Sequence, residues 1–277
     1  MSDAAKDDAR AVLARLGTAD DDGLDIAEAA LAFAIIDRPD APIAPVRAHL
    51  AQLIRAGATL AGNRGAEERA LALRGLVCGG HGYTGDRDTY DDPANANLIS
   101  VVERRRGLPV ALGIIWLHTA AAAGFDAWGI DFPGHFLLGI GGHGESGHGE
   151  SVVIDVFDSG TIREEDELAA LLARVAGPAA RLGPDHLRPM TARQVLLRLQ
   201  NNIRLRRVAA GALDTALAAA EDMLLLAPYS APLWREAALL AERAGQKRAA
   251  INAWERLRGF GSAEAGEALA RLRRQMN

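Results

Sequence analysis

Apolar residues recur at helical spacing throughout the first third of the chain. In residues 23–37 and 42–58 they fall on one face of the expected helix, and a further helix is expected over residues 66–77. A shorter stretch of the same kind covers residues 4–16 and is closed by Gly17, a residue type that often ends helices because it adopts left-handed backbone angles. The pattern predicts an all-helical front part.

The middle of the chain changes from helical to strand-like patterning. Pro109 favours a helix start because it needs no backbone partner there and its φ is already fixed. The apolar run after it extends to Gly124, where a helix can end. Three short apolar segments bounded by Gly and Pro follow and have the length of strands: 125–131, 136–140 and 151–157. We expect a buried helix, with the front helices packed on it near Val110, followed by a small antiparallel sheet.

The last third of the chain is helical again, and its pattern repeats. From Thr191 onwards, Gly211 recurs as Gly245 and Ala216 recurs as Ala250, in both cases 34 residues later. This is the period of tetratricopeptide repeats. Small residues at such positions let the two helices of a repeat approach closely. The sequence therefore predicts two tetratricopeptide-like repeats.

A connector rich in Pro and Gly that runs to Pro189 suggests a domain boundary. It separates a predicted first domain, residues 1–180, from a predicted helical-repeat domain, residues 190–277. Two repeats are fewer than the roughly three that an independent solenoid needs. We therefore expect the first domain to buttress them and an amphipathic helix over residues 262–274 to close them. The predicted fold class is α+β: a helical N-terminal part and a small antiparallel sheet, followed by an all-α repeat region.

Composition narrows the classes of function. Of the 277 residues, 49% are hydrophobic and 24% are charged, and the net charge of −5 gives no general reason to expect nucleic acid or an anionic membrane as a partner. The single cysteine, Cys78, excludes an internal disulfide and fits a reducing compartment. The start of the chain lacks the features of a signal peptide, and no uncharged run has the length of a membrane span. We expect a cytoplasmic protein without a cofactor.

Two residues of the predicted sheet form the strongest candidate site. His135 opens one strand, and Asp155 lies in the next strand between Ile154 and Val156. In a regular strand Asp155 faces away from these apolar neighbours, and it needs a partner because an unpaired buried carboxylate is costly. His135, 20 positions earlier, adjoins it if the intervening loop is a hairpin. A helix start, a His and an Asp in this order are also the arrangement of papain-like enzymes, which place their nucleophile at the helix start.

Three sequence blocks resemble the transglutaminase-like family and, within it, the bacterial SirB type. In that type an Arg-Arg-Gly-Ile/Leu-Pro segment precedes Pro-Gly-His-Phe and then an Ile-Asp-Pro-Phe-like strand. The matching blocks are residues 105–112 (RRGLPVAL), 133–136 (PGHF) and 154–157 (IDVF). The resemblance covers roughly residues 20–260. It implies a papain-like fold, C-terminal tetratricopeptide-like repeats and a Cys-His-Asp triad in which His135 and Asp155 hold the last two places.

The chain departs from the family at the nucleophile. Active members of the family carry a Cys two residues after the glycine of the first block, where this chain has Pro109. No residue of the segment 107–113 is Cys, Ser or Thr, and the first hydroxyl of the helix, on Thr119, lies more than two turns beyond its start. The resemblance therefore implies a degenerate member, in which a His135–Asp155 dyad remains and a structural role for it is favoured over a chemical one.

Three residues outside the dyad are candidates for binding. Arg105 lies in the run 104–106, which is either an anion site or a solvated face. The three side chains spread round a helix, so the solvated face is favoured, with one arginine pairing a carboxylate. Trp128 adjoins strand residues that can line a cleft. Trp234 stands on the first helix of the second repeat, and repeat surfaces commonly bind peptides.

Two stretches rich in Gly and His invite a chemical interpretation. Cys78 could replace the missing nucleophile beside His135, but a small apolar residue at a helix end is the favoured interpretation. The loop 141–150 carries imidazole and carboxylate groups that suit a metal ion. Its glycines leave these ligands unorganised, so a hairpin tip is favoured over a metal site. The candidate ligands are His143, Glu145, His148 and Glu150.

The sequence leaves three functions open. The first is a non-catalytic transglutaminase-like protein that acts as a protein-interaction or scaffold component and binds a protein or peptide through its fold and repeats. The alternative is a residual, cysteine-independent amidase or peptidase that uses the His135–Asp155 dyad, since general-base action alone contributes about 10²–10⁴-fold to a rate. The third is metal binding through the loop 141–150. The absent nucleophile favours the first function, and the oligomeric state stays open.

Overall fold

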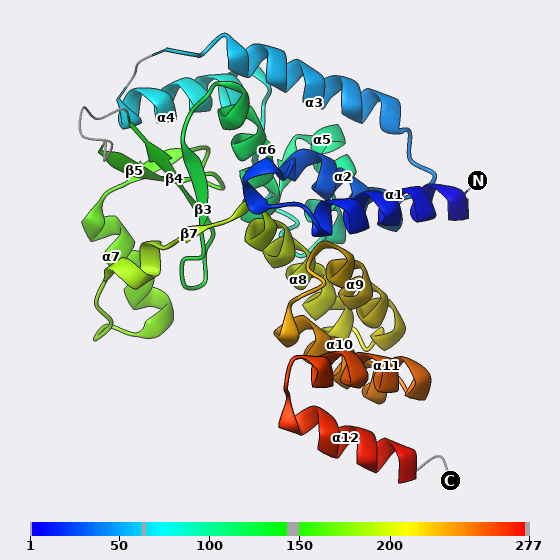
Figure 1. Ribbon diagram of the computed structural model, residues 1–277. Coiled ribbons are helices and arrows are strands. Elements are labelled where there is room, and N and C mark those ends of the chain that lie inside the picture. Colours follow the sequence, from blue (N-terminus) through cyan, green and yellow to red (C-terminus); the bar gives the residue numbers. More distant parts are fainter. Residues whose placement is uncertain (1, 63–64, 143–149, 275–277) are drawn as a thin grey trace. The chain divides into compact units, whose positions relative to one another are not determined.

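The computed structural model describes residues 2–62, 65–142 and 150–274, and the chain forms two compact units (Figure 1). The first unit comprises Met1–Ala9 and Asp20–Leu199, and the second comprises Arg10–Ala19 and Gln200–Asn277. The helix at the N-terminus and the helix that passes through residue 200 therefore contribute to both units.

Helices fill most of the first unit, as predicted for the front part of the chain, and capping residues set several of their starts. At the start of α2, the carboxylate of Asp25 accepts hydrogen bonds from the N–H groups of Ala27 and Glu28. Asn97 caps α5 in the same way. The α-helices are α1 (Ser2–Gly17), α2 (Ile26–Asp37), α3 (Ile43–Ala58), α4 (Ala66–Arg74), α5 (Leu98–Arg104), α6 (Pro109–Ala122), α7 (Glu165–Ala176) and α8 (Ala192–Ala209). Shorter helical turns are η1 (Asp21–Gly23), η2 (Gly75–Gly80), η3 (Pro93–Asn95) and η4 (Pro184–Leu187).

The small antiparallel sheet expected from the sequence is present, with the strand order β6-β5-β4-β3-β7. β4 and β5 form the predicted hairpin, in which Leu138 lies opposite Ile154. Leu168 and Leu172 of α7 pack on sheet residues, while α4 contacts β4 and β5 on the other side (Figure 1). The strands of this sheet are β3 (Ala127–Ile130), β4 (Leu137–Gly141), β5 (Ser151–Asp155), β6 (Thr161–Arg163) and β7 (Pro189–Met190), and β1 (Thr84–Gly85) pairs in parallel with β2 (Arg106–Gly107).

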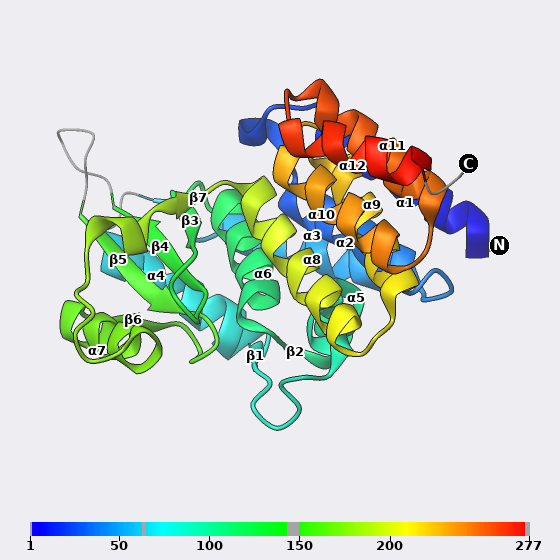
Figure 2. The same cartoon turned by 90° about the horizontal axis from the view of Figure 1, so that it is seen from below.

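α6 is the central helix of the first unit and is buried along most of its length. It begins at Pro109, and the chain leaves it through Gly124 with a φ of 69°, as the sequence predicted. It contacts α2 and α3 as well as β3 and β4, so it lies between the front helices and the sheet (Figure 1, Figure 2). A Cβ on Gly113 would come within 2.3 Å of the Phe136 ring, so the close approach of α6 and the sheet depends on a residue without a side chain.

The second unit is all-helical. Gly211 follows α8 and Gly245 follows α10, with φ values of 73° and 72°, which explains why glycine recurs there. The assignment of these helices to two tetratricopeptide-like repeats stays a prediction. α10 contacts α9 and α11, and α11 contacts α12. The α+β fold class is confirmed. The helices after α8 are α9 (Leu213–Leu226), α10 (Ala231–Arg243), α11 (Lys247–Gly259) and α12 (Ala263–Arg274).

Residues near the N-terminus complete the second unit. The Arg10 guanidinium lies 2.8 Å from the Asp222 carboxylate, and a Cβ on Gly17 would lie 2.0 Å from the carbonyl oxygen of Leu225. α1 and α9 therefore approach at backbone distance. The linear limits 1–180 and 190–277 stay a prediction and do not describe this association. Among the described residues, no helix combines the length and the apolar character that crossing a membrane requires.

Candidate functional site

The hairpin of β4 and β5 brings His135 and Asp155 together. His135 follows a turn whose third residue, Gly134, has a φ of 69°. It does not open the strand as predicted, because β4 begins two residues later, at Leu137. Asp155 is the last residue of β5. Nε2 of His135 lies 3.0 Å from Oδ2 of Asp155. Because an ionised carboxylate only accepts hydrogen bonds, Nε2 is the donor, and Nδ1 is the ring nitrogen that this carboxylate leaves available.

The carboxylate of Asp155 is buried and accepts hydrogen bonds from four groups. Oδ2 accepts from His135 and, at 3.0 Å, from Nη2 of Arg163. Oδ1 accepts from the backbone N–H groups of Phe157 and Asp158, both at 3.1 Å. Burial alone would raise the pKa of Asp155, but the hydrogen bonds and the charges of its partners lower that pKa to about 2. Asp155 therefore ties the start of β4, β6 and the turn after β5 together.

Arg163 extends this network towards α7 and the loop after β1. Its guanidinium also contacts the carboxylates of Asp158 at 2.7 Å and Glu167 at 3.3 Å. Burial lowers the pKa of Arg163, and the hydrogen bond and charge of Asp155 raise it, with a net upward shift. Arg87 pairs with Asp158 at 2.8 Å. The sequence did not predict Arg163, because its role depends on the register that places Arg163 opposite Val153.

The position that a nucleophile would occupy is apolar. Pro109 is the first residue of α6 and is buried, and no side chain caps the helix there. The backbone just before it is fixed by the pairing of Gly107 with Gly85. The first hydroxyl of α6, on Thr119, donates to the carbonyl oxygen of Ile115 at 2.8 Å and is therefore engaged within the helix.

A second arginine that the sequence did not predict supports the backbone at the histidine. Arg198 of α8 donates to the carbonyl oxygen of His135 at 2.8 Å, pairs with Asp131, and lies over the Phe136 ring with its guanidinium carbon 5.8 Å from the ring centroid. Burial lowers the pKa of Arg198. Asp155 thus positions the imidazole ring of His135, and Arg198 positions the backbone of the same residue.

Comparison with known proteins decides the family. A sequence profile described as the transglutaminase-like superfamily matches residues 44–201, which include Pro109 and both members of the dyad. This chain belongs to the transglutaminase-like superfamily. No solved structure matches it.

The chain is also similar to bacterial UPF0162 proteins. The chain is 34% identical over 169 residues to a UPF0162 protein of Vibrio cholerae, a match that covers 61% of each chain. It is 30% identical over 174 residues to one of Xylella fastidiosa, covering 62% of this chain and 60% of the relative. It is also 30% identical over 207 residues to one of Pseudomonas aeruginosa, covering 74% of this chain and 73% of the relative. The chain thus spans about three fifths of the length of the first two relatives.

The transglutaminase-like unit uses Arg105 and its neighbour Arg104 for internal contacts. Arg105 ends α5 with a φ of 58°, and its guanidinium lies 3.1 Å from both the Tyr83 hydroxyl and Nδ1 of His49. Arg104 pairs with the buried carboxylate of Asp86, which is the carboxylate-pairing role that the sequence predicted for one arginine of this run. A binding role of Arg105 stays a prediction.

Trp128 lies on β3 and is half-buried. A Cβ on Gly139 of β4 would come within 2.3 Å of the indole, so the ring rests on the face of the neighbouring strand. Trp128 also lines a hollow of about 250 Å³, together with residues such as Leu24 and Leu117. Its contacts are those of a residue at the margin of the sheet core.

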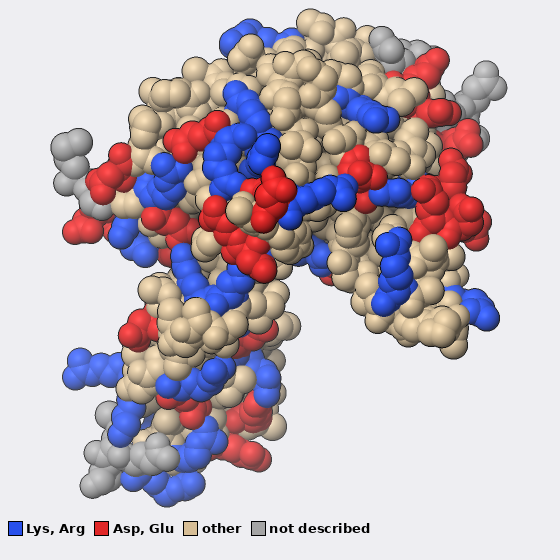
Figure 3. All heavy atoms as spheres, turned by 180° about the vertical axis from the view of Figure 1, so that it is seen from behind, with Lys and Arg blue, Asp and Glu red and all other residues tan. Residues whose placement is uncertain are grey.

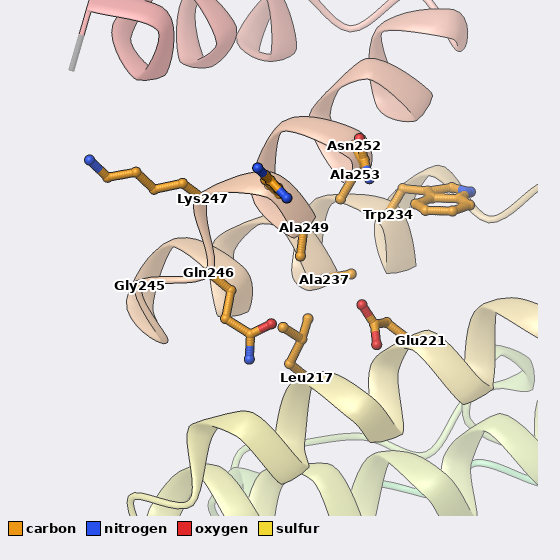
Figure 4. A pocket seen from close by; sticks show the side chains of 11 residues that line it. Leu217, Glu221, Trp234, Ala237, Gly245, Gln246, Lys247, Ala249, Asn252 and Ala253 are labelled. Carbon is orange, nitrogen blue, oxygen red and sulfur yellow. The ribbon is translucent and has the colours of Figure 1, made fainter. Parts of the chain in front are cut away.

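Trp234 is the candidate in the second unit. Its indole N–H donates to the carbonyl oxygen of Pro228 at 2.8 Å, which joins α10 to the turn before it. Trp234 lines two hollows, one of about 670 Å³ among α9, α10 and α11 (Figure 4) and one of about 510 Å³ at the end of α11. Neither hollow includes His135, Asp155 or Pro109.

The remaining candidates carry less chemistry. Burial raises the pKa of the half-buried Cys78 thiol to about 11, and because Arg74 lowers it only in part, the thiol is protonated at neutral pH. Three of the four metal-ligand candidates, His143, Glu145 and His148, lie outside the described residues. Within the described ranges, no group of three His, Cys, Asp or Glu side chains is arranged to hold a metal ion.

Proposed function

We propose that this protein is a non-catalytic member of the transglutaminase-like superfamily, of the SirB type, that acts as a protein-interaction component. The observation that carries the proposal is the buried Pro109 at the first position of α6. A proline has no side-chain group that attacks a carbonyl, so covalent catalysis at this position is not available to the chain. The surfaces of the fold can still bind a partner.

The polar groups around the former site support the same conclusion. A general base needs an orienting carboxylate, but the Asp155 carboxylate also holds Arg163 and two backbone N–H groups. A carboxylate that is committed to four donors in this way is typical of a structural role. The Cys78 thiol, with a pKa of about 11, is a poor substitute nucleophile.

The interaction half of the proposal rests on the second unit. Its helices carry the two hollows beside Trp234. The aromatic side chains of Tyr229 and Phe260 line one of them and are exposed. Exposed aromatic side chains next to hollows are typical of protein-binding surfaces. We infer that the partner is a protein or peptide.

One observation favours a second candidate function. The 3.0 Å hydrogen bond from His135 to Asp155 fixes the imidazole and leaves Nδ1 available as a general base. A residual, cysteine-independent amidase or peptidase would use this nitrogen to activate water. Its expected rate enhancement from the base is about 10²–10⁴-fold.

Intact-protein mass spectrometry during incubation with an aryl ester and with a glutamine-containing peptide amide tests both functions. We expect no acyl adduct on the chain and a rate of hydrolysis that is the same for the wild type and for His135→Ala. An acyl adduct that maps to any residue would contradict the non-catalytic proposal. Hydrolysis that is lost in His135→Ala, with the fold retained by circular dichroism, would instead establish the residual enzyme.

A further inference from the structure

Two stretches that the sequence singles out separately meet in the first unit. Arg105 comes from the arginine run 104–106, and His81 comes from the glycine-rich segment after α4. His49 of α3 contacts both, because its Nδ1 lies 3.1 Å from Nη2 of Arg105 and its ring centroid lies 5.3 Å from that of His81. We define the Arg105 cluster as His49, His81, Tyr83 and Arg105.

The backbone on two sides of this cluster departs from regular structure. Arg105 ends α5 with a φ of 58°, a value that side chains other than glycine rarely adopt, and among the described non-glycine residues only Ser159 shares it. His81 directly follows η2, whose wide π-helical hydrogen bonding often occurs at functional sites. Such strained positions persist where the surrounding structure holds a residue in place, and they concentrate at binding sites.

The guanidinium of Arg105 is held in place with donors to spare. It is half-buried, and its carbon lies 5.1 Å from the centroid of the Tyr83 ring. Nη1 donates to the Tyr83 hydroxyl at 3.1 Å and to the carbonyl oxygen of Val102, and Nη2 donates to His49. These bonds use three of the five N–H donors of an arginine, and all three acceptors are uncharged. In the described chain, Nε and Nη2 each keep one N–H free.

The two neighbouring arginines show what is particular about Arg105. Arg104 pairs with the buried carboxylate of Asp86 at 2.5 Å, and Arg106 lies 3.5 Å from the carboxylate of Asp88. No carboxylate of the described residues pairs with Arg105. It is therefore the member of this run that is fixed by neutral groups and lacks a counter-charge, a combination that favours an anionic ligand.

His49 adds a buried donor without a partner. Because Nδ1 accepts from Arg105, the proton of the neutral ring is on Nε2. The imidazole is only 9% exposed, and Nε2 has no partner in hydrogen-bond geometry among the described residues. The amide of Gln52, one turn further along α3, interacts with the ring and opposes the lowering of its pKa, but it leaves Nε2 unsatisfied. Buried donors are nearly always satisfied, so an acceptor from outside the chain would complete this one.

Cations set the electrostatic field at the cluster. Burial, then the charges of Arg105 and His81, lower the pKa of His49 to about 4, and burial, then the charge of Arg105, lower the pKa of His81. Burial raises the pKa of Tyr83 to about 12, and Arg105 opposes this rise. The charged groups that act on all three side chains are thus cationic, and a bound anion would be stabilised by the same field.

The glycine-rich segment leaves room beside the cluster. A Cβ on Gly79 or on Gly82 would meet no other atom within 4 Å. His81 lies between these glycines in the sequence, is partly exposed, and packs edge-on against His49 with an angle of 76° between the rings. A change of the His81 rotamer towards the open side would admit a small ligand to Nε2 of His49.

We propose that the Arg105 cluster binds a phosphate group. The two free donors of Arg105 contact phosphate oxygens in the bidentate manner that suits a guanidinium, and Nε2 of His49 donates to a further oxygen. His81 supplies a ring N–H from the solvent side. Donors from α3, α5 and the segment after η2 approach from different directions, which suits a tetrahedral anion better than a planar carboxylate. The site shares no residue with the His135–Asp155 dyad or with the second unit, so it goes beyond the proposed function and stands or falls separately from it.

Nuclear magnetic resonance of the histidine side chains in the full-length protein tests this proposal. The probe is inorganic phosphate, titrated at pH 7 and at constant ionic strength against chloride, with ring signals assigned from single His→Gln variants. We expect the His49 and His81 signals to shift and to saturate. The signal of His118, another buried histidine whose ring is bonded to the carbonyl oxygen of Leu50, should not move. Acetate, a planar anion, should require about tenfold higher concentrations.

A second probe distinguishes the sources of the phosphate group. Glycerol 3-phosphate carries the same group on a small organic molecule, and tighter binding than inorganic phosphate would assign the site to a phosphorylated molecule. Equal or weaker binding would assign it to free phosphate. Equal binding of acetate and phosphate would overturn the assigned ligand chemistry.

Matched variants separate the cluster from the general charge of the surface. Arg105→Gln should weaken phosphate binding by about tenfold or more, whereas Arg106→Gln makes the same change at a guanidinium that already lies near Asp88 and should leave binding unchanged. Arg105→Lys keeps the charge but loses the planar donors, so it should bind with intermediate affinity. His81→Gln changes a partly exposed side chain and should weaken binding by about fivefold with the fold retained.

Three results would overturn the proposal. The first is an absence of saturable shifts at His49 and His81, and the second is a shift of equal size at His118. The third is phosphate binding that stays the same in Arg105→Gln and His81→Gln as in the wild type. The intermediate affinity expected of Arg105→Lys is a result that a general loss of folding would not produce.

Discussion

The two units differ in the balance of their charged side chains and in where some of these side chains lie. The first unit contains 17 Lys and Arg against 28 Asp and Glu, whereas the second contains 14 against 8. In the first unit, charges of both signs interleave over the surface, in the upper part of Figure 3, and the buried Asp155 carboxylate holds a histidine and an arginine side chain. In the second unit, Glu221 and Arg256 stand beside hollows without any ion pair in the described chain.

This difference separates polar groups that build the fold from polar groups that remain available to a partner. A buried carboxylate with four donors has no capacity left for a ligand, and removing it leaves other groups unsatisfied. A carboxylate or guanidinium at a hollow has open capacity, and replacing it costs the fold little. The dyad residues of the first unit match the family motif, but their hydrogen bonds commit them to the fold. Residues of the second unit that match no motif are therefore more available to a partner.

The largest test of this comparison is the removal of the Asp155 carboxylate. Asp155→Ala leaves Arg163 and the turn after β5 without their acceptor, and we expect a loss of about 3–5 kcal/mol in the free energy of unfolding. Urea denaturation at pH 7 measures it. Asp158→Ala, which removes a more exposed partner of Arg163, is the matched control and should cost much less. A loss of under about 1 kcal/mol in Asp155→Ala would contradict the structural role of this carboxylate.

The pH dependence of Asp155 has a defined sign. Its pKa of about 2 lies below the value of about 3.9 for an unfolded chain, so its stabilising effect is complete above about pH 4 and is lost as the pH falls through about 2. In acid titrations of stability, this step should be missing from Asp155→Ala.

The second test concerns His49, a buried histidine of the first unit beside Arg105. Burial, then the charges of Arg105 and His81, lower the pKa of His49 to about 4. The unfolded chain binds this proton near pH 6.5, so stability should fall by up to about 3 kcal/mol as the pH drops from about 6.5 to about 4. Chemical denaturation across this range measures the loss. His49→Gln should flatten it, and an unchanged slope in that variant would assign the loss to other groups.

A third test addresses the packing that holds the dyad loop. Gly113→Ala would place a Cβ 2.3 Å from the Phe136 ring, next to His135 in the sequence. Overpacking of this kind typically costs about 1–3 kcal/mol. Thermal unfolding measures the cost, and Gly266→Ala on α12, where a Cβ meets nothing, is the control. Equal melting temperatures for the two variants would show that α6 and the sheet can separate without loss.

The smallest expected effect is at the surface of the second unit. Tyr229 is 77% exposed, so Tyr229→Ala should change the free energy of unfolding by no more than about 0.5 kcal/mol. Under the proposed interaction function, the same variant should weaken binding of a peptide partner at this surface, because one aromatic wall of the hollow at the end of α11 is lost. Thermal unfolding and anisotropy on one preparation give both numbers. A large loss of stability would show that Tyr229 stabilises the fold and would contradict its assignment to the side chains that are available to a partner.

Local patterns were sufficient to predict much of the fold. Pro109 and Gly124 bound the central helix as expected, and the recurrence of Gly211 as Gly245 reflects the same left-handed backbone angle at equivalent helix ends. The helical segment predicted over residues 66–77 extends further in the structure, because α4 continues into the wider turns of η2, which ends at Gly80. Such a change in hydrogen bonding leaves no mark in an apolar pattern.

The parts that the sequence did not predict depend on tertiary register. Arg163 reaches Asp155 only because β6 pairs with β5 at Val153, and Arg198 reaches His135 from α8, 63 positions away. Glu221 and Arg256 become related only when α9 and α11 pack on either side of α10. Isolated charged residues at helical spacing usually indicate a solvated face, so their position beside Trp234 required the structure.

The association of Arg10–Ala19 with the second unit has a consequence for synthesis and for cloning. Arg10 meets Asp222 across 212 positions, so a ribosome releases this segment long before α9 exists to receive it, and final closure of the repeat unit waits for most of the chain. A shortened gene that starts at the connector before α8 would encode the repeats without the strip of helix that covers Leu225. Such a product would present that surface to solvent from the moment it is made.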